Sequence, residues 1–202
     1  MKLTRIVVLI AIGLGGCVTP PIPPEKPSSG WGEYRGTIQT EWLADGRNMI
    51  LLSDATYTAP NGTVWLAPKG WKVDGATIPQ AFWSIIGGPF EGRYRNASVF
   101  HDVACDKKNA RWQDVHLMFY NAMRCSGENE ETAKIMYASV YRFARRWGEP
   151  TLNALIRPQA FLPVNRNPTK EEAKQIAAWI RTNKPSLEQI RQSTVQPGAP
   201  SP

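Results

Sequence analysis

The chain has 202 residues, 42% of them hydrophobic and 20% charged, so it is long enough for one sizeable folded domain and too apolar to be disordered throughout. Three cysteines are too few for a small disulfide-rich scaffold. The formal net charge of +7 favours a nucleic-acid-binding protein only if the basic residues lie on the folded part. Residues 31–149 carry 14 basic against 13 acidic side chains, whereas residues 150–202 carry seven against three. We therefore expect no nucleic-acid ligand and a basic tail that is able to touch anionic surfaces.

The distribution of proline divides the chain. Five of the 17 prolines lie between Pro20 and Pro27 and eight lie from Pro150 onward, so only four fall within residues 31–149. Proline interrupts both helices and sheets. The pattern predicts a proline-rich tether over residues 17–30, one globular domain over residues 31–149, and a C-terminal extension over residues 150–202 that is frayed at its end.

The first 16 residues have the composition of a signal peptide. Lys2 and Arg5 precede a short apolar run from Ile6 to Leu14. Nine residues of helix cover only about half of a bilayer core, which indicates an export signal rather than a membrane span.

The end of this signal resembles the bacterial lipobox, carried here by Leu14-Gly15-Gly16-Cys17. The resemblance implies cleavage before Cys17 and lipidation of that cysteine, which then anchors the protein in a lipid bilayer. Val18 follows, where enterobacterial lipoproteins retained at the inner membrane carry Asp, so the resemblance implies an outer-membrane location facing the periplasm. An ordinary signal that happens to end in Cys is the alternative. The tether from residue 18 to 30 spans roughly 30–40 Å if it is extended.

The first half of the globular part has the features of short antiparallel strands. Each apolar or β-branched run ends at a turn signal such as Asp45-Gly46 or Pro60-Asn61-Gly62. We predict a β-meander whose strands are Thr37–Leu43, Asn48–Tyr57, Thr63–Ala67 and Trp71–Val73.

After Pro79 the apolar spacing changes to the period of a helix. In the C-terminal extension, Thr169 begins a capping box with Glu172, and Ser186 is positioned to open a further short helix. The fold class is therefore α+β: a small antiparallel meander, then a helical half, then a proline-interrupted helical extension that packs through Phe161, Ile176, Trp179 and Ile180. The predicted helices are Asn96–Asp106, Trp112–Arg124, Glu130–Trp147 and Thr169 to about Arg181.

Acidic residues and both histidines of the chain are concentrated in one stretch. A cluster of His101, Asp102, Asp74 and Asp114 is plausible, with His116 a weaker member because residues two apart on a helix point in different directions. Such a set suits general acid–base catalysis, and His101, Asp102 and Asp114 suit a divalent transition metal such as zinc. The alternative is structural, with the aspartates capping turns and helices and the histidine hydrogen-bonded internally.

These residues carry a family resemblance. The segment from Trp71 to Pro79, which contains Asp74-Gly75-Ala76-Thr77-Ile78-Pro79, resembles the bacterial and phage family called domain of unknown function 1353. Phe82-Trp83, His101-Asp102, Arg111, Asp114 and Phe119 complete the pattern, and Thr77 stands where the family usually has Ser. The likeness covers about residues 36–147. It implies a compact α+β domain with a polar cluster at Asp74, His101, Asp102 and Asp114, and it implies no established activity.

Cys105 and Cys125 lie on neighbouring predicted helices. In an oxidising compartment a disulfide between them would stabilise the domain by roughly 3 kcal/mol. The alternative is that Cys105 is a nucleophile beside His101, which export disfavours. Of the eight tryptophans, we expect Trp31 and Trp42 to be exposed and most of the others to lie in the core.

Two functions remain open from the sequence. The first is an envelope hydrolase, metal-assisted, that acts on cell-wall or other periplasmic material through the His/Asp cluster. The second is a non-catalytic tethered module, which binds an envelope component or a partner protein, inhibits, or excludes phage, and in which the polar cluster is structural. Convergence of the four side chains in an open cleft favours the first function, and buried, mutually hydrogen-bonded groups favour the second.

Overall fold

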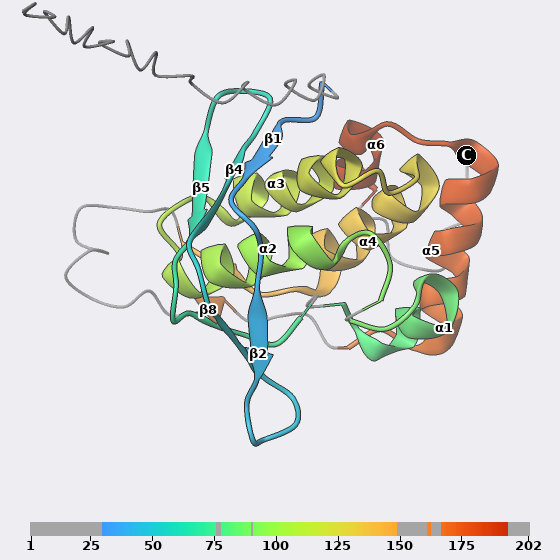
Figure 1. Cartoon of the computed structure of the whole chain (residues 1–202). Helices are drawn as coiled ribbons and strands as arrows, with labels where there is room; N and C mark the ends of the chain where they lie inside the picture. The colour runs from blue at the N-terminus through green and yellow to red at the C-terminus, as the bar shows by residue number, and fades with distance from the viewer. Residues whose placement is uncertain (1–29, 76–77, 90, 149–160, 163–166, 194–202) are drawn as a thin grey trace, which may run out of the picture.

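The computed structural model describes residues 30–75, 78–89, 91–148, 161–162 and 167–193. It confirms the predicted α+β class, with short antiparallel strands followed by helices (Figure 1). The predicted signal peptide, Cys17 and nearly all of the tether lie outside the described residues. Within the described part, none of the helices has the length and apolar character that crossing a bilayer requires.

Two small antiparallel sheets form the N-terminal half. One has the order β1-β4-β5 and the other has the order β2-β3-β6, so the chain alternates between the sheets instead of forming one meander. The strands are β1 (Glu33–Arg35), β2 (Thr40–Trp42), β3 (Met49–Leu51), β4 (Ala55–Thr58), β5 (Val64–Ala67) and β6 (Lys72–Val73).

The predicted strand Asn48–Tyr57 is wrong as a single element. It divides into β3 and β4, which belong to different sheets. The chain leaves the β2-β3-β6 sheet at Ser53 and Asp54. The Ser53 hydroxyl donates to the carbonyl of Thr37 (2.8 Å), and the Asp54 carboxylate accepts from Lys69 N–H (2.6 Å). These two bonds tie the corner between β3 and β4 to segments 16 and 15 residues away in the sequence, and they hold the chain where it passes from one sheet to the other.

Three helices form the centre of the molecule. α2 (Arg95–Lys107), α3 (Trp112–Cys125) and α4 (Glu130–Phe143) agree with the predicted starts to within one residue. Lys108 in the left-handed region ends α2, and the Asn129 side chain caps α4 by accepting from Thr132 N–H (2.8 Å). A short 3-10 turn η1 (Gln80–Phe82) and α1 (Trp83–Ile86) precede these helices.

The predicted helix Glu130–Trp147 is four residues too long. α4 ends at Phe143, because Ala144 is extended and Arg146–Trp147 forms strand β7, paired with β8 (Phe161–Leu162). The two side chains of β7 explain the change. The indole N–H of Trp147 donates to the carbonyl of Ala110 (2.8 Å), and the Arg146 guanidinium stacks 4.7 Å from the ring centre of Trp112. These tertiary contacts override the helical spacing.

The helical part of the C-terminal extension packs on the domain. α5 (Lys170–Asn183) begins at the predicted capping box of Thr169 and Glu172, and α6 (Leu187–Gln192) begins at a second one. Ile176 and Ile180 are buried in the same core as α4, as the sequence predicts, and Trp179 is partly buried. The side chain of Phe161 lies outside the described residues.

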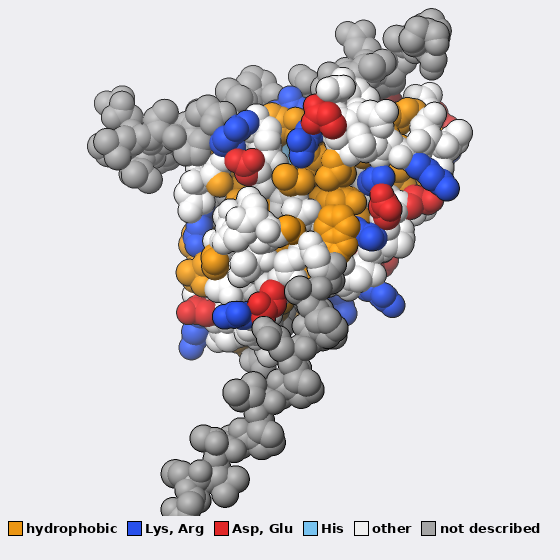
Figure 2. Space-filling model, turned by 90° about the horizontal axis from the view of Figure 1, so that it is seen from above, with side chains coloured by type: hydrophobic (Ala, Val, Ile, Leu, Met, Phe, Trp, Pro, Cys, Tyr) orange, Lys and Arg blue, Asp and Glu red, His pale blue; other side chains and the backbone are white. Residues whose placement is uncertain are grey.

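Figure 2 shows Lys/Arg and Asp/Glu side chains interspersed around a hydrophobic centre on the face seen from above. Trp42 is 55% exposed, as expected. The expectation for Trp31 is wrong, because it packs edge-on to Tyr120 with the guanidinium of Arg124 5.2 Å from its ring centre.

Candidate functional site

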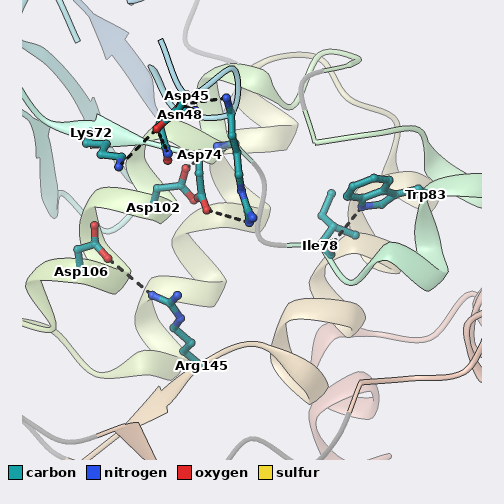
Figure 3. Close-up of polar contacts among 11 residues, drawn as sticks. Asp45, Asn48, Lys72, Asp74, Ile78, Trp83, Asp102, Asp106 and Arg145 are labelled. Atoms are coloured by element: carbon teal, nitrogen blue, oxygen red, sulfur yellow. Dashed lines mark hydrogen bonds and ion pairs between the residues drawn. The ribbon is translucent and has the colours of Figure 1, made fainter. Parts of the chain in front are cut away.

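An open polar cleft lies between the β2-β3-β6 sheet and helix α2 (Figure 3). At its edge, the chain leaves β6 at Asp74 and turns at Gly75, whose φ of 89° is in the left-handed region that glycine tolerates. Gly75 N–H donates to the Asp102 carboxylate (3.0 Å). This hydrogen bond joins the Asp-Gly turn to α2, and it brings together two of the acidic residues that the sequence singled out.

One face of α2 forms the floor of the cleft. Asp102, Cys105 and Asp106 are three and four residues apart, so they share that face. Asp102 is 6% exposed and Cys105 is 5% exposed, which makes them the deepest polar groups. The cleft encloses about 200 Å³ and is lined by Asn48, Lys72, Asp74, Asp102, Cys105, Asp106 and Arg145.

The basic side chains lie at the rim. Each pairs loosely with a carboxylate: Arg47 with Asp74 (3.7 Å), Lys72 with Asp45 (3.8 Å) and Arg145 with Asp106 (3.8 Å). All three separations exceed hydrogen-bond length, and all three cationic side chains are more than half exposed. Ion pairs of this kind contribute little to stability, so a ligand is able to replace the Arg47–Asp74 and Lys72–Asp45 pairs at little cost.

The loop between β2 and β3 is held by Asp45. Its carboxylate accepts from Arg47 N–H (3.0 Å) and from Asn48 through both the backbone N–H (2.8 Å) and the side chain (2.6 Å). These bonds to Asn48 and Arg47 lower the pKa of Asp45 to about 2. The loop therefore holds Asn48 and Arg47 at the cleft by fixed local bonds.

The two histidines form a separate, fully buried pair between α2 and α3. His101 Nε2 and His116 Nδ1 are 2.9 Å apart, so one donates and the other accepts. The rings of Phe119, Trp112 and Tyr141 surround the pair, with centroids 4.6 Å from His101 for Phe119 and 5.6 and 6.5 Å from His116 for Trp112 and Tyr141.

Burial keeps both histidines neutral. It lowers the pKa of His101 to about 3, and it lowers the pKa of His116 well below the ordinary value, with a further contribution from the neighbouring His101. The outer nitrogen of His116, Nε2, is buried and has no partner in hydrogen-bond geometry, although the backbone of Arg145 lies nearby. Cys105 Sγ lies 3.7 Å from His101 Nε2, and burial together with Asp102 and Asp106 raises its pKa. A thiol that stays protonated is a poor nucleophile.

The four-residue cluster expected from the sequence does not form. Asp74 and Asp102 meet at the cleft, whereas His101 projects into the core on another face of α2. Asp114 lies in the first turn of α3, is about half exposed and faces Arg111 (3.9 Å). His116, given less weight from the sequence, is the direct partner of His101.

The metal set expected from the sequence also does not converge. Among the described residues, no group of three or more His, Cys, Asp or Glu side chains is placed to hold a metal ion. His101 directs its Nε2 to His116, Asp102 accepts from Gly75 N–H, and Asp114 faces Arg111, so each donates or accepts in a different direction.

The predicted Cys105–Cys125 disulfide is wrong, because the two sulfurs are not bonded. α2 and α3 are joined by a short turn and aligned by the His101–His116 contact. Cys105 lies four residues from that contact towards the turn, and Cys125 lies nine residues away from it in the opposite direction. At 1.5 Å per residue the cysteines are about 20 Å apart along the hairpin, far beyond the reach of a disulfide. Cys125 instead donates to the carbonyl of Gly32 (3.2 Å).

Sequence reasoning missed the residues that complete the cleft, namely Arg47, Asn48, Lys72 and Arg145. The Asp45-Gly46 turn signal was readable, but nothing local indicates that its loop lies over Asp74. Arg145 falls within the predicted helix Glu130–Trp147, and it reaches the cleft because α4 ends before it.

The central part of the chain is similar to a protein family and to two curated proteins. Residues 49–140 match the family model described as "Protein of unknown function (DUF1353)". Two curated relatives come from Sinorhizobium fredii. Uncharacterized protein y4jT is 49% identical over 105 residues, which are 52% of this chain and 31% of y4jT. Uncharacterized protein y4iH is 38% identical over 104 residues, which are 52% of this chain and 44% of y4iH.

The chain thus spans less than half the length of these relatives, and no solved structure matches it. The matched region begins at β3 and ends in α4, so it contains both the cleft carboxylates and the histidine pair. Over residues 49–140 this chain is therefore similar to the DUF1353 family.

Proposed function

We propose that the protein is a non-catalytic binding module of the cell envelope, anchored through lipidated Cys17, and that the polar cleft is its binding site. The anchor rests on the basic start, the short apolar run and the Gly-Gly-Cys ending, and the outer membrane facing the periplasm is the proposed location. The partner is an envelope component with charged groups, such as cell-wall peptide, which carries both ammonium and carboxylate groups.

The observation that carries this proposal is the burial of both histidines beneath the floor of the cleft, where Cys105 lies between His101 and the cleft. The cleft presents carboxylates and loosely paired cations to solvent, whereas His101 and His116 are buried, neutral and bonded to each other. General acid–base catalysis requires a titratable group within hydrogen-bond reach of a substrate proton. The histidine pair does not meet this requirement, which supports binding over a hydrolysis that depends on the histidines.

The binding claim is tested by isothermal titration of the full-length protein, in detergent micelles, with a soluble cell-wall muropeptide. We expect saturable binding that Asp102→Asn weakens at least tenfold, because the variant removes the negative charge. The new amide oxygen is still able to accept from Gly75 N–H, which makes Asn the mildest substitution. Asp114→Asn is the matched control, because Asp114 lies outside the cleft. Turnover of the muropeptide that depends on His101 would overturn the proposal in favour of the hydrolase.

The anchor is tested separately. Mass spectrometry of the membrane fraction is expected to show an acylated N-terminal cysteine at position 17, and Cys17→Ser is expected to lose acylation. An unmodified Cys17 in the mature protein would contradict the anchor and leave the cleft proposal standing.

A further inference from the structure

The floor of the cleft is negative and its rim is positive. The Asp102 side chain lies at the bottom with the residue only 6% exposed, whereas the side chains of Arg47, Lys72 and Arg145 are 78%, 59% and 53% exposed. An exposed cation interacts with a bound ligand through solvent of high dielectric constant, so the interaction is weak. A buried carboxylate interacts through a medium of lower dielectric constant, so its interaction is stronger. A charged group at the bottom of the cleft therefore lies next to the Asp102 carboxylate.

The raised pKa of Cys105 agrees with a negative electrostatic potential at the floor of the cleft. Burial is the largest cause of its raised pKa, and the charges of Asp102 and Asp106 raise it further, with Arg145 opposing them. The carboxylates thus outweigh the nearby guanidinium at the position of the sulfur. The same field stabilises a positive charge placed there.

Arg47 already supplies such a charge from within the chain. Its guanidinium approaches Asp74 from the β2–β3 loop at 3.7 Å, beyond hydrogen-bond length, and its side chain is 78% exposed. Exposed ion pairs contribute about 0–1 kcal/mol, so a ligand displaces this guanidinium at little cost. The loop itself stays in place, because Asp45 holds its backbone independently of the Arg47 side chain.

We propose that the cleft takes a cationic N–H group of its ligand, an ammonium or a guanidinium, between Asp74 and Asp102, and that Arg47 competes with the ligand for this position. This inference rests on the proposed function and specifies the ligand chemistry of the same site. Arg47 is then a positioning residue that lowers affinity, and its removal strengthens binding.

The test uses small probes and the full-length protein, with the amide resonance of Gly75 as reporter because its N–H bonds to Asp102. N-acetyl-arginine amide and N-acetyl-lysine amide are the cationic probes, and N-acetyl-glutamate amide is the anionic control. We expect both cationic probes to shift the Gly75 resonance saturably. Arg47→Ala is expected to tighten binding roughly two- to fivefold, and Asp102→Asn to weaken it at least tenfold.

Arg35→Ala is the matched control for Arg47→Ala, since Arg35 pairs with Glu33 in the other sheet and is similarly exposed. Its affinity is expected to equal that of the unmodified protein. Unchanged or weaker binding by Arg47→Ala would overturn the competition. Preference for the anionic probe would overturn the ligand chemistry and leave the proposed function intact, whereas failure of every probe and of the muropeptide to bind would refute both.

Discussion

The buried histidine pair predicts a loss of stability in mild acid. In the folded protein His101 and His116 stay neutral because burial lowers both pKa values, to about 3 for His101. In the unfolded chain each binds a proton near pH 6.5. The unfolded state therefore holds more protons below that pH, so the stabilisation is complete above pH 6.5 and declines as the pH falls towards 3.

The magnitude follows from the proton count. For each histidine, the free energy of unfolding falls by about 1.4 kcal/mol per pH unit below pH 6.5. At pH 5 the loss is roughly 2 kcal/mol for one histidine and roughly 4 kcal/mol for the pair. Because the chain contains only these two histidines, and carboxylates bind few protons above pH 5, the interval from pH 7 to pH 5 isolates the pair.

Urea unfolding followed by tryptophan fluorescence at pH 7, 6 and 5 measures this loss. In His116→Gln only one histidine remains, so the loss between pH 7 and pH 5 is expected to fall to roughly 2 kcal/mol, whatever the variant's stability at pH 7. A free energy of unfolding that is constant from pH 7 to pH 5, or an equal loss in the variant, would refute the buried neutral pair.

Two further predictions concern the cysteines and the C-terminal extension. Dithiothreitol is expected to leave the melting temperature unchanged, and both Cys105 and Cys125 are expected to react with a thiol reagent after unfolding without reductant; a missing pair of thiols would contradict the separated cysteines. Ile180→Ala is expected to cost roughly 2–4 kcal/mol in urea unfolding because this α5 side chain is 2% exposed, whereas the exposed Lys174→Ala on the same helix is expected to change stability by less than about 0.5 kcal/mol. Equal effects of the two substitutions would show that α5 is not part of the core.

The helices were the most predictable part of the fold. The starts of α2, α3 and α4 follow from apolar spacing, and that of α5 follows from the capping box at Thr169, because these signals are local. The end of α4 was not predictable in this way, since Trp147 is withdrawn from the helix by its bond to Ala110, a partner 37 residues away.

The candidate site was predictable only in part. The four-residue spacing in the sequence places Asp102 and Asp106 on one face of α2, and both line the cleft. The sequence does not indicate that His116 meets His101, because that contact depends on the alignment of α2 with α3. Likewise, Asp114 and Asp74 are both acidic residues near helix or strand ends, and only tertiary packing places Asp74 at the cleft and Asp114 outside it.

The central claim is that this domain binds its ligand at the carboxylate cleft and uses the histidine pair only for structure. The most direct measurement maps amide chemical-shift changes of the full-length protein during titration with the muropeptide. The account predicts that the largest changes cluster at Asn48, Lys72, Gly75 and Asp106, with residues around Trp112 and Tyr141 unaffected. Changes centred on Trp112 and Tyr141, beside the histidines, would contradict it.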